Sequence, residues 1–136
     1  MASVKQELDR PTNPKTQDLR VFETGATRDT DSEKPEYAGF NSPLVEKRFG
    51  EYMHSHRKQA NGTLRSSSNW KKGIPKEVYL QSIHRHFLDF WLHMDGFPDA
   101  AIDPDIEAVL CALRFNVNGV LYEILKEKYA KLPKTP

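Results

Sequence analysis

The sequence predicts an all-α fold, a bundle of about three long helices preceded by an irregular N-terminal arm. Apolar residues recur at helical spacing in three stretches between about residues 40 and 130. Serine, aspartate, proline and glycine mark the ends of these stretches, as they do at helix termini. A length of 136 residues suits one domain. We therefore expect a disordered or loosely docked arm over residues 1–20 and a single helical domain over residues 21–132.

The arm is predicted from polarity and broken periodicity. Residues 1–20 are mostly polar, and Pro11 and Pro14 interrupt them. A segment of this kind has too little apolar surface to form a packed core.

The first predicted helix begins at Ser42 and Pro43, because serine is a good N-cap and proline suits the first helical position. Asn61 and Gly62 supply the next stop signal. One apolar stripe follows the helical period and contains Val45, Phe49, Tyr52, Met53 and His56.

The second predicted helix runs from Pro75 to about Met94, and Gly96 and Pro98 end it. The third opens with Asp103 as its cap and Pro104 at its first position. The buried face predicted for the third helix contains Ile106, Leu110, Leu113, Val117, Val120, Leu121, Ile124 and Leu125. The opposite side carries Asp105, Ala112, Asn116, Gly119 and Glu123, where small residues would let a ligand or another helix approach closely. The residues expected in the core are Phe87, Trp91, Leu110, Leu113 and Leu121.

Composition narrows the partners and the compartment. Twenty basic residues nearly balance nineteen acidic ones, so no strong field attracts nucleic acid or a membrane. The single cysteine, Cys111, lies in an apolar run and is expected to be a buried hydrophobe. The sequence shows no signal-peptide core and no continuous apolar run of membrane-spanning length. We therefore expect a cytoplasmic protein without a membrane partner.

Two groups of side chains are candidates for metal or proton chemistry. His86, Asp89 and His93 share one face of the second helix, where imidazoles and a carboxylate can bind a divalent cation or exchange protons. Asp105 and Glu107 near the start of the third helix, beside Asp103, can hold magnesium. The alternative is structural in both cases, because such residues also make ordinary hydrogen bonds and favour a helix N-terminus. Both interpretations remain open.

Phosphate-binding candidates lie outside the helices. Arg28 follows Gly25 in the segment GATRDT and offers a planar fork for phosphate oxygens. In SSSNWKKGIP, Trp70 can stack on a base while Lys72 neutralises phosphate charge. A packed ring between two solvated lysines is the alternative. Asn116, an amide in an apolar stretch, needs a partner that is either a ligand or another helix.

Several segments together resemble a known family. The segments are FETGATRDTDSEKPEYAGF, SPLVEKRFGEYMHSHRKQANG, NWKKGIPKEVYLQSIHRHFLDFW and DIEAVLCALRFNVNGVLYEIL, which cover roughly residues 20–125. They resemble the phage and prophage family described as the N-terminal domain of dATP/dGTP diphosphohydrolase, related in concept to MazG-like nucleotide pyrophosphohydrolases. The most specific pieces are Gly25–Asp29, Asn69–Trp70, Lys72–Pro75, Arg85–His86 and Asn116.

This resemblance implies magnesium-dependent cleavage of dATP or dGTP to the monophosphate and pyrophosphate. The paired E-x-x-E and E-x-x-D motifs of MazG-like enzymes are not on the predicted helices, and the one E-x-x-E joins Glu33 to Glu36. The resemblance therefore assigns Asp89, Asp105 and Glu107 as metal ligands and His86 and Asp89 as catalytic residues. It assigns Arg28, Trp70, Lys72 and Asn116 to the nucleotide.

Three functions remain open from the sequence. The first is the hydrolase, in the host cytoplasm if the chain is phage-encoded and acting on a purine deoxynucleotide or a related small molecule. The second is a non-catalytic binder that sequesters a nucleotide or a nucleotide-derived signal. The third is a structural or interaction module. The resemblance also implies a homo-oligomer, because MazG-like helical pairs complete their pockets by dimerisation.

Overall fold

Two units make up the chain in the computed structural model, which describes residues 19–30 and 33–133. The first unit ends at Phe40 and the second begins at Asn41. The sequence analysis places a boundary near residue 20, whereas this division falls 20 residues later. The predicted arm lies outside the described residues, except for its last two, Leu19 and Arg20.

A β-hairpin that was not predicted from the sequence lies in the first unit. Strands β1 (Leu19–Val21) and β2 (Thr27–Asp29) pair antiparallel, with Arg20 opposite Arg28. The connecting turn closes through a hydrogen bond from the Phe22 amide to the Ala26 carbonyl, 2.9 Å long. Gly25 has a φ of +86°, a conformation that glycine adopts without steric cost.

Helix α2 (Pro43–Ser55) starts where the sequence predicts, because the Ser42 side chain accepts a hydrogen bond from the Val45 amide. The stop signal at Asn61 and Gly62 predicted a longer helix, but α2 ends at Ser55, six residues before Asn61. Ser55 Oγ lies 2.6 Å and His56 Nδ1 lies 3.0 Å from the carbonyl oxygen of Tyr52. Side chains that bond the backbone in this way compete with helix continuation. The chain then turns back on itself, and the Arg65 amide donates to the Arg57 carbonyl.

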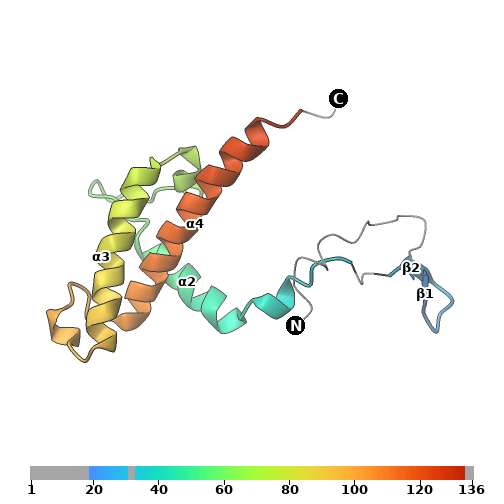
Figure 1. Ribbon diagram of the computed structural model, residues 1–136, viewed down its shortest axis with the longest axis horizontal. Coiled ribbons are helices and arrows are strands. Elements are labelled where there is room, and N and C mark those ends of the chain that lie inside the picture. The colour runs from blue at the N-terminus through green and yellow to red at the C-terminus, as the bar shows by residue number, and fades with distance from the viewer. Residues whose placement is uncertain (1–18, 31–32, 134–136) are drawn as a thin grey trace, which may run out of the picture. The chain divides into compact units, whose positions relative to one another are not determined.

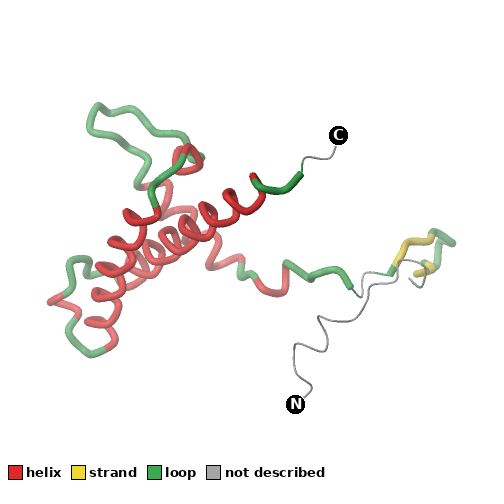
Figure 2. The backbone as a smooth tube through the Cα atoms, turned by 45° about the horizontal axis from the view of Figure 1, so that its top comes forward, coloured by secondary structure: helices red, strands yellow, loops and turns green. Residues whose placement is uncertain are grey.

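The long helices α3 (Lys76–Met94) and α4 (Ile106–Ala130) pack against each other, and α2 packs against α4 (Figure 1). The α3–α4 connection is irregular, and Figure 2 shows it at the far end of the helix pair from the loop that follows α2. The cap of α4 is Asp105 rather than Asp103, since Asp105 Oδ1 accepts from the Glu107 amide. Within residues 19–30 and 33–133, three α-helices and one short hairpin confirm the predicted all-α bundle.

The predicted buried face of α4 is wrong. The side that packs on α3 carries the small and polar residues Ala112, Asn116, Gly119 and Glu123, all buried. Tyr79 of α3 lies so close to Gly119 that an added Cβ would sit 2.2 Å from the tyrosine ring. A helical pattern states which residues share a face, whereas the size of the side chains decides how closely another helix approaches.

The expected core is wrong for the same reason. Phe87, Trp91, Leu110 and Leu121 are 46–60% exposed, and Leu113 is half-buried. The buried apolar residues in the part of the chain that the structure describes are Tyr79, Val109, Cys111 and Ala112. Cys111 is therefore buried, as predicted, and burial raises the pKa of its thiol.

Helix α4 is long and apolar enough to span a membrane by length and composition alone. Its most apolar window has a mean hydropathy of 1.4, although polar residues interrupt it and leave no continuous apolar run. The core helix of a soluble protein passes the same test, so this property is weak evidence for a membrane.

Candidate functional site

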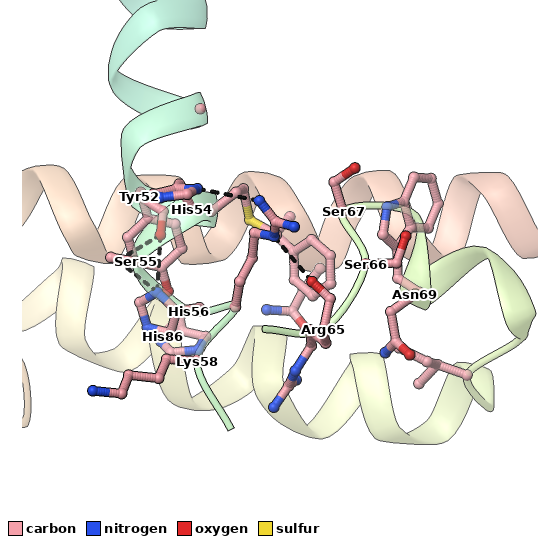
Figure 3. A pocket seen from close by; sticks show the side chains of 17 residues that line it. Tyr52, His54, Ser55, His56, Lys58, Arg65, Ser66, Ser67, Asn69 and His86 are labelled. Carbon is pink, nitrogen blue, oxygen red and sulfur yellow. Dashed lines mark hydrogen bonds between the residues drawn. The ribbon is translucent and has the colours of Figure 1, made fainter. Parts of the chain in front are cut away.

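A cavity of about 790 Å³ opens beside the C-terminal end of α2, within the second unit (Figure 3). Its size lies within the range of roughly 300–1,000 Å³ that is usual for small-molecule sites. The loop after α2, the short 3-10 helix η3 (Asn69–Lys72), α3 and α4 complete its walls. The lining residues are Gly50, Tyr52, Met53, His54, Ser55, His56, Arg57, Lys58, Arg65, Ser66, Ser67, Asn69, Trp70, Ile74, His86, Phe115 and Asn116.

One wall of the cavity is basic. His54, His56, Arg57 and Lys58 come from the end of α2 and the residues after it, and Arg65 comes from the returning strand of the loop. The loop is held by backbone pairing of Arg57 with Arg65 and by a 2.9 Å hydrogen bond from Arg57 Nε to the Arg65 carbonyl. None of the lining residues is an aspartate or a glutamate. The wall therefore presents positive charge and hydrogen-bond donors to the cavity.

Two of these cations are available to a ligand. The side chains of Lys58 and Arg65 have no ion pair or hydrogen bond within the described part of the chain, and both lie around the cavity in Figure 3. Arg57 is different, because its guanidinium also lies 3.4 Å from His54 Nδ1. Lys58 and Arg65 can therefore turn toward an anion without losing a bond to the protein.

The other wall is aromatic. Trp70 packs edge-on against Tyr122, with ring centroids 4.8 Å apart, and against Phe115 at 6.5 Å. In the basic wall, the centroid of the Tyr52 ring lies 4.3 Å from that of the His56 ring. These contacts hold flat apolar surfaces at fixed positions beside the basic wall.

His86 and Asn116 extend the cavity toward α3 and α4. Burial lowers the pKa of His86, so its imidazole is neutral at pH 7. Asn116 Nδ2 donates to the Ala112 carbonyl at 2.7 Å, which leaves Oδ1 without a donor among the described residues. The pair can therefore offer a neutral imidazole and an amide oxygen to a polar ligand.

The predicted carboxylates lie elsewhere and have protein partners. Both oxygens of the buried Asp89 accept backbone hydrogen bonds, from Ile102 at 2.9 Å and from Asp103 at 3.1 Å. Asp105 caps α4, and Arg48 pairs with both Asp105 and Glu107. Within residues 19–30 and 33–133, no group of three histidine, cysteine, aspartate or glutamate residues is arranged to hold a metal. Magnesium binding stays a prediction.

His93, the third member of the predicted face on α3, also has a structural contact. Its Nε2 lies 2.8 Å from the carbonyl oxygen of Asp103. His93 and Asp89 therefore hold the segment that leads into α4, whereas His86 reaches the cavity.

The structure brings together three of the predicted site residues, Trp70, His86 and Asn116. Lys72 is exposed on η3 and does not line the cavity. Arg28 is exposed on β2 in the first unit. Phosphate contacts by Lys72 and Arg28 stay predictions.

The sequence analysis missed the basic wall. The run His54-Ser55-His56-Arg57-Lys58 holds four basic side chains within five residues, and this density was the available signal. The prediction of a longer helix placed His56 in an apolar stripe, whereas α2 ends at Ser55 and His56 lines the cavity. The contribution of Arg65 depends on the loop that folds back, which no periodicity indicates.

Comparison with known protein families, with curated proteins and with solved structures finds no significant match for this chain. The resemblance described above therefore remains an expectation.

Proposed function

We propose that this chain binds a nucleotide, a purine deoxynucleotide or a related phosphorylated small molecule, in the cavity beside α2. One observation carries the proposal: basic side chains and aromatic rings line a single cavity, and no carboxylate is among its lining residues. Phosphate groups require cations and donors, and a base requires a flat apolar surface.

The two walls suggest how such a ligand is held. The phosphates lie against Lys58 and Arg65, whose side chains have no competing partner among the described residues. The base lies beside Trp70, and Asn116 Oδ1 accepts from an exocyclic amino group, which both adenine and guanine carry. The serines at 66 and 67 add hydroxyl donors between the two walls.

Binding is favoured over hydrolysis as the proposed function. Hydrolysis with magnesium requires carboxylates at the phosphates, and Asp89, Asp105 and Glu107 have partners away from the cavity. His86 is the lining residue suited to accept a proton from water, because its imidazole is neutral. Turnover is therefore measured beside binding as a separate outcome.

The test uses the tryptophans, of which the chain has two. Trp91 lies outside the cavity, so the Trp91→Phe variant reports from Trp70 alone. Titration with dGTP and with dATP should change the Trp70 fluorescence and saturate. Pyrophosphate release with magnesium would support the hydrolase, whereas saturable binding without release would support the sequestering protein.

A matched pair of variants locates the site. Arg65→Gln keeps the backbone pairing of the loop and should weaken binding about tenfold, as expected for the loss of one charged contact. Arg85→Gln removes an exposed arginine of α3 that does not line the cavity and should leave the affinity unchanged. Equal affinities for both variants would show that the nucleotide does not bind against Arg65 in this cavity. No saturable signal with either nucleotide would leave the structural module as the surviving function.

A further inference from the structure

The outward sides of α3 and α4 each carry an apolar stripe, and the two stripes have the same spacing. The residues are Leu80, Phe87, Trp91 and Met94 on α3, and Leu110, Val117, Leu121 and Ile124 on α4. In both helices the intervals are seven, four and three residues, the spacing of a helix-packing seam. All eight side chains are 46–61% exposed. We call these eight residues the outer apolar face.

The two stripes lie on the same side of the helix pair. On each helix, half-buried residues lie between the stripe and the buried side: Ile83 and Phe90 on α3, and Leu113 and Val120 on α4. Figure 1 shows that the two helices run in opposite directions. Because the stripe is displaced in the same rotational sense on both helices, opposite directions bring the stripes to one side. Phe87, Phe90, Trp91 and Met94 surround a shallow apolar hollow there.

The helical unit buries little of its own apolar surface. Among the described residues, four apolar side chains are buried, whereas the eight of the outer apolar face lie half-exposed. Removing such surface from water is the main favourable term in association, and contiguous exposed patches mark interaction sites.

The distribution of charge along α4 indicates that a second copy of the chain covers the outer apolar face. Asp105 and Glu107 at the N-terminal end of α4 share the single cation Arg48, so this end keeps a net negative charge, and Lys128 and Lys131 lie at the C-terminal end. Two antiparallel copies of α4 would bring Lys128 of each copy toward Glu107 of the other and would align the helix dipoles favourably. A twofold axis produces both contacts at once, because the same patch serves on both subunits.

We propose that two copies of the chain associate through the outer apolar face, with their α4 helices side by side and antiparallel. Val117 is the midpoint of the stripe from Leu110 to Ile124, so it lies next to the partner's Val117. This inference does not depend on nucleotide binding, since none of the eight residues lines the cavity beside α2.

Sedimentation equilibrium of the full chain is the first test. The wild type should sediment as a dimer, and Leu121→Glu should sediment as a monomer with its helical circular dichroism retained. The matched control is Leu44→Glu, which places the same charge at an 80% exposed leucine of α2 and should remain dimeric. A monomeric wild type at the highest soluble concentration, or a folded Leu121→Glu dimer, would overturn the proposal.

A cross-linking variant decides the case even if Leu121→Glu fails to fold. Val117→Cys should form an intermolecular disulfide under mild oxidation, because the two thiols would meet near the twofold axis, whereas the buried Cys111 should not react. Leu44→Cys is the control and should stay uncross-linked. A dimer that forms without cross-linking through Val117→Cys would contradict the antiparallel arrangement.

A lipid surface is the competing occupant and is tested with the same face. In the Trp70→Phe variant, Trp91 is the remaining tryptophan, and its emission should shift to the blue as protein concentration rises. Phosphatidylcholine vesicles should cause no shift beyond this. A shift that requires vesicles and is independent of protein concentration would overturn the dimer.

Discussion

The two sides of α4 belong to the same stretch of the chain, but their side chains differ in size. The inward side presents Ala112 and Gly119, and α3 approaches so closely that Tyr79 is almost fully buried against it. The outward side presents Val117 and Leu121, each about half-exposed. Small residues therefore select the face that another helix of the same chain contacts, and the larger apolar residues remain for a different partner.

The candidate cavity is lined by residues from the inward side of α4 and none from its outward side. Asn116, on the inward side, and its neighbour Phe115 line the cavity, whereas the outer apolar face contributes no lining residue. Packing and ligand binding thus use one part of α4, and the proposed association uses another. Substitutions on the two sides should have separable effects, which the following predictions examine in order of decreasing size.

The largest loss of stability is expected at Gly119. In Gly119→Ala the new methyl group would overlap the Tyr79 ring, so the free energy of unfolding should fall by about 3 kcal/mol. The control is Gly50→Ala in α2, where a Cβ meets nothing within 4 Å, and helix propensity should raise stability by up to about 1 kcal/mol. Urea unfolding measures both. Equal free energies of unfolding for the two variants would show that Tyr79 does not lie close enough to position 119 to meet the new methyl group.

The second prediction concerns Asp89, on the inward side of α3. Asp89→Asn can accept only one of the two backbone hydrogen bonds that the carboxylate accepts, and should cost about 2 kcal/mol. Asp99→Asn, at an exposed position between α3 and α4, should cost nothing measurable. If Asp89→Asn instead kept its stability and lost magnesium-dependent pyrophosphate release, the catalytic assignment of Asp89 would be supported.

The third prediction applies one substitution to both sides of α4. Val109→Ala, at a position 1% exposed, should lower the free energy of unfolding by about 1.5 kcal/mol through the loss of two buried methyl groups. Val117→Ala, at a position 51% exposed, should cost less than about 0.5 kcal/mol in solution dilute enough to dissociate the proposed dimer. A cost at Val117 that matches Val109 and is independent of protein concentration would mean that the outward side is covered within one chain.

The smallest effect is a change in pH dependence at His86. Burial lowers its pKa in the folded chain, so the unfolded chain binds a proton more readily as pH falls below about 6.5. Acidification from pH 7.5 to pH 5.5 should therefore destabilise the wild type, and His86→Gln should lose part of this slope. Chemical unfolding at the two pH values measures it, and an unchanged slope would indicate that His86 is more exposed than its place in the cavity implies.

The fold class followed from local signals. The Ser42 cap and the stop beyond Met94 placed helix ends within a few residues, because capping depends on neighbours in the sequence. The orientation of α4 did not follow, since a leucine stripe and a stripe of alanine and glycine both fit a helix. Only the close approach of Tyr79 to Gly119 shows which stripe is buried.

The candidate site was predictable in part. Three predicted site residues line one cavity: Trp70, His86 and Asn116. The sequence indicated them because a tryptophan between lysines, a histidine on a helix face and an amide in an apolar stretch are unusual in those surroundings. Arg65 was not predictable, because its position depends on a loop that pairs with residues eight positions earlier. The two backbone amides that donate to the buried Asp89 carboxylate were not predictable either, because they belong to the irregular segment after α3, and the assignment of Asp89 to a metal stays a prediction.

A single nuclear magnetic resonance experiment compares the cavity beside α2 with the outer apolar face directly. Each tryptophan gives one indole N–H signal, and the chain has one tryptophan in the cavity, Trp70, and one on the outer apolar face, Trp91. Adding dGTP at constant protein concentration should move the Trp70 signal and leave Trp91 in place. Diluting the protein without dGTP should move Trp91 alone. If dGTP at saturating concentration moved neither signal, or moved only that of Trp91, the proposal that the cavity beside α2 binds a nucleotide would be contradicted.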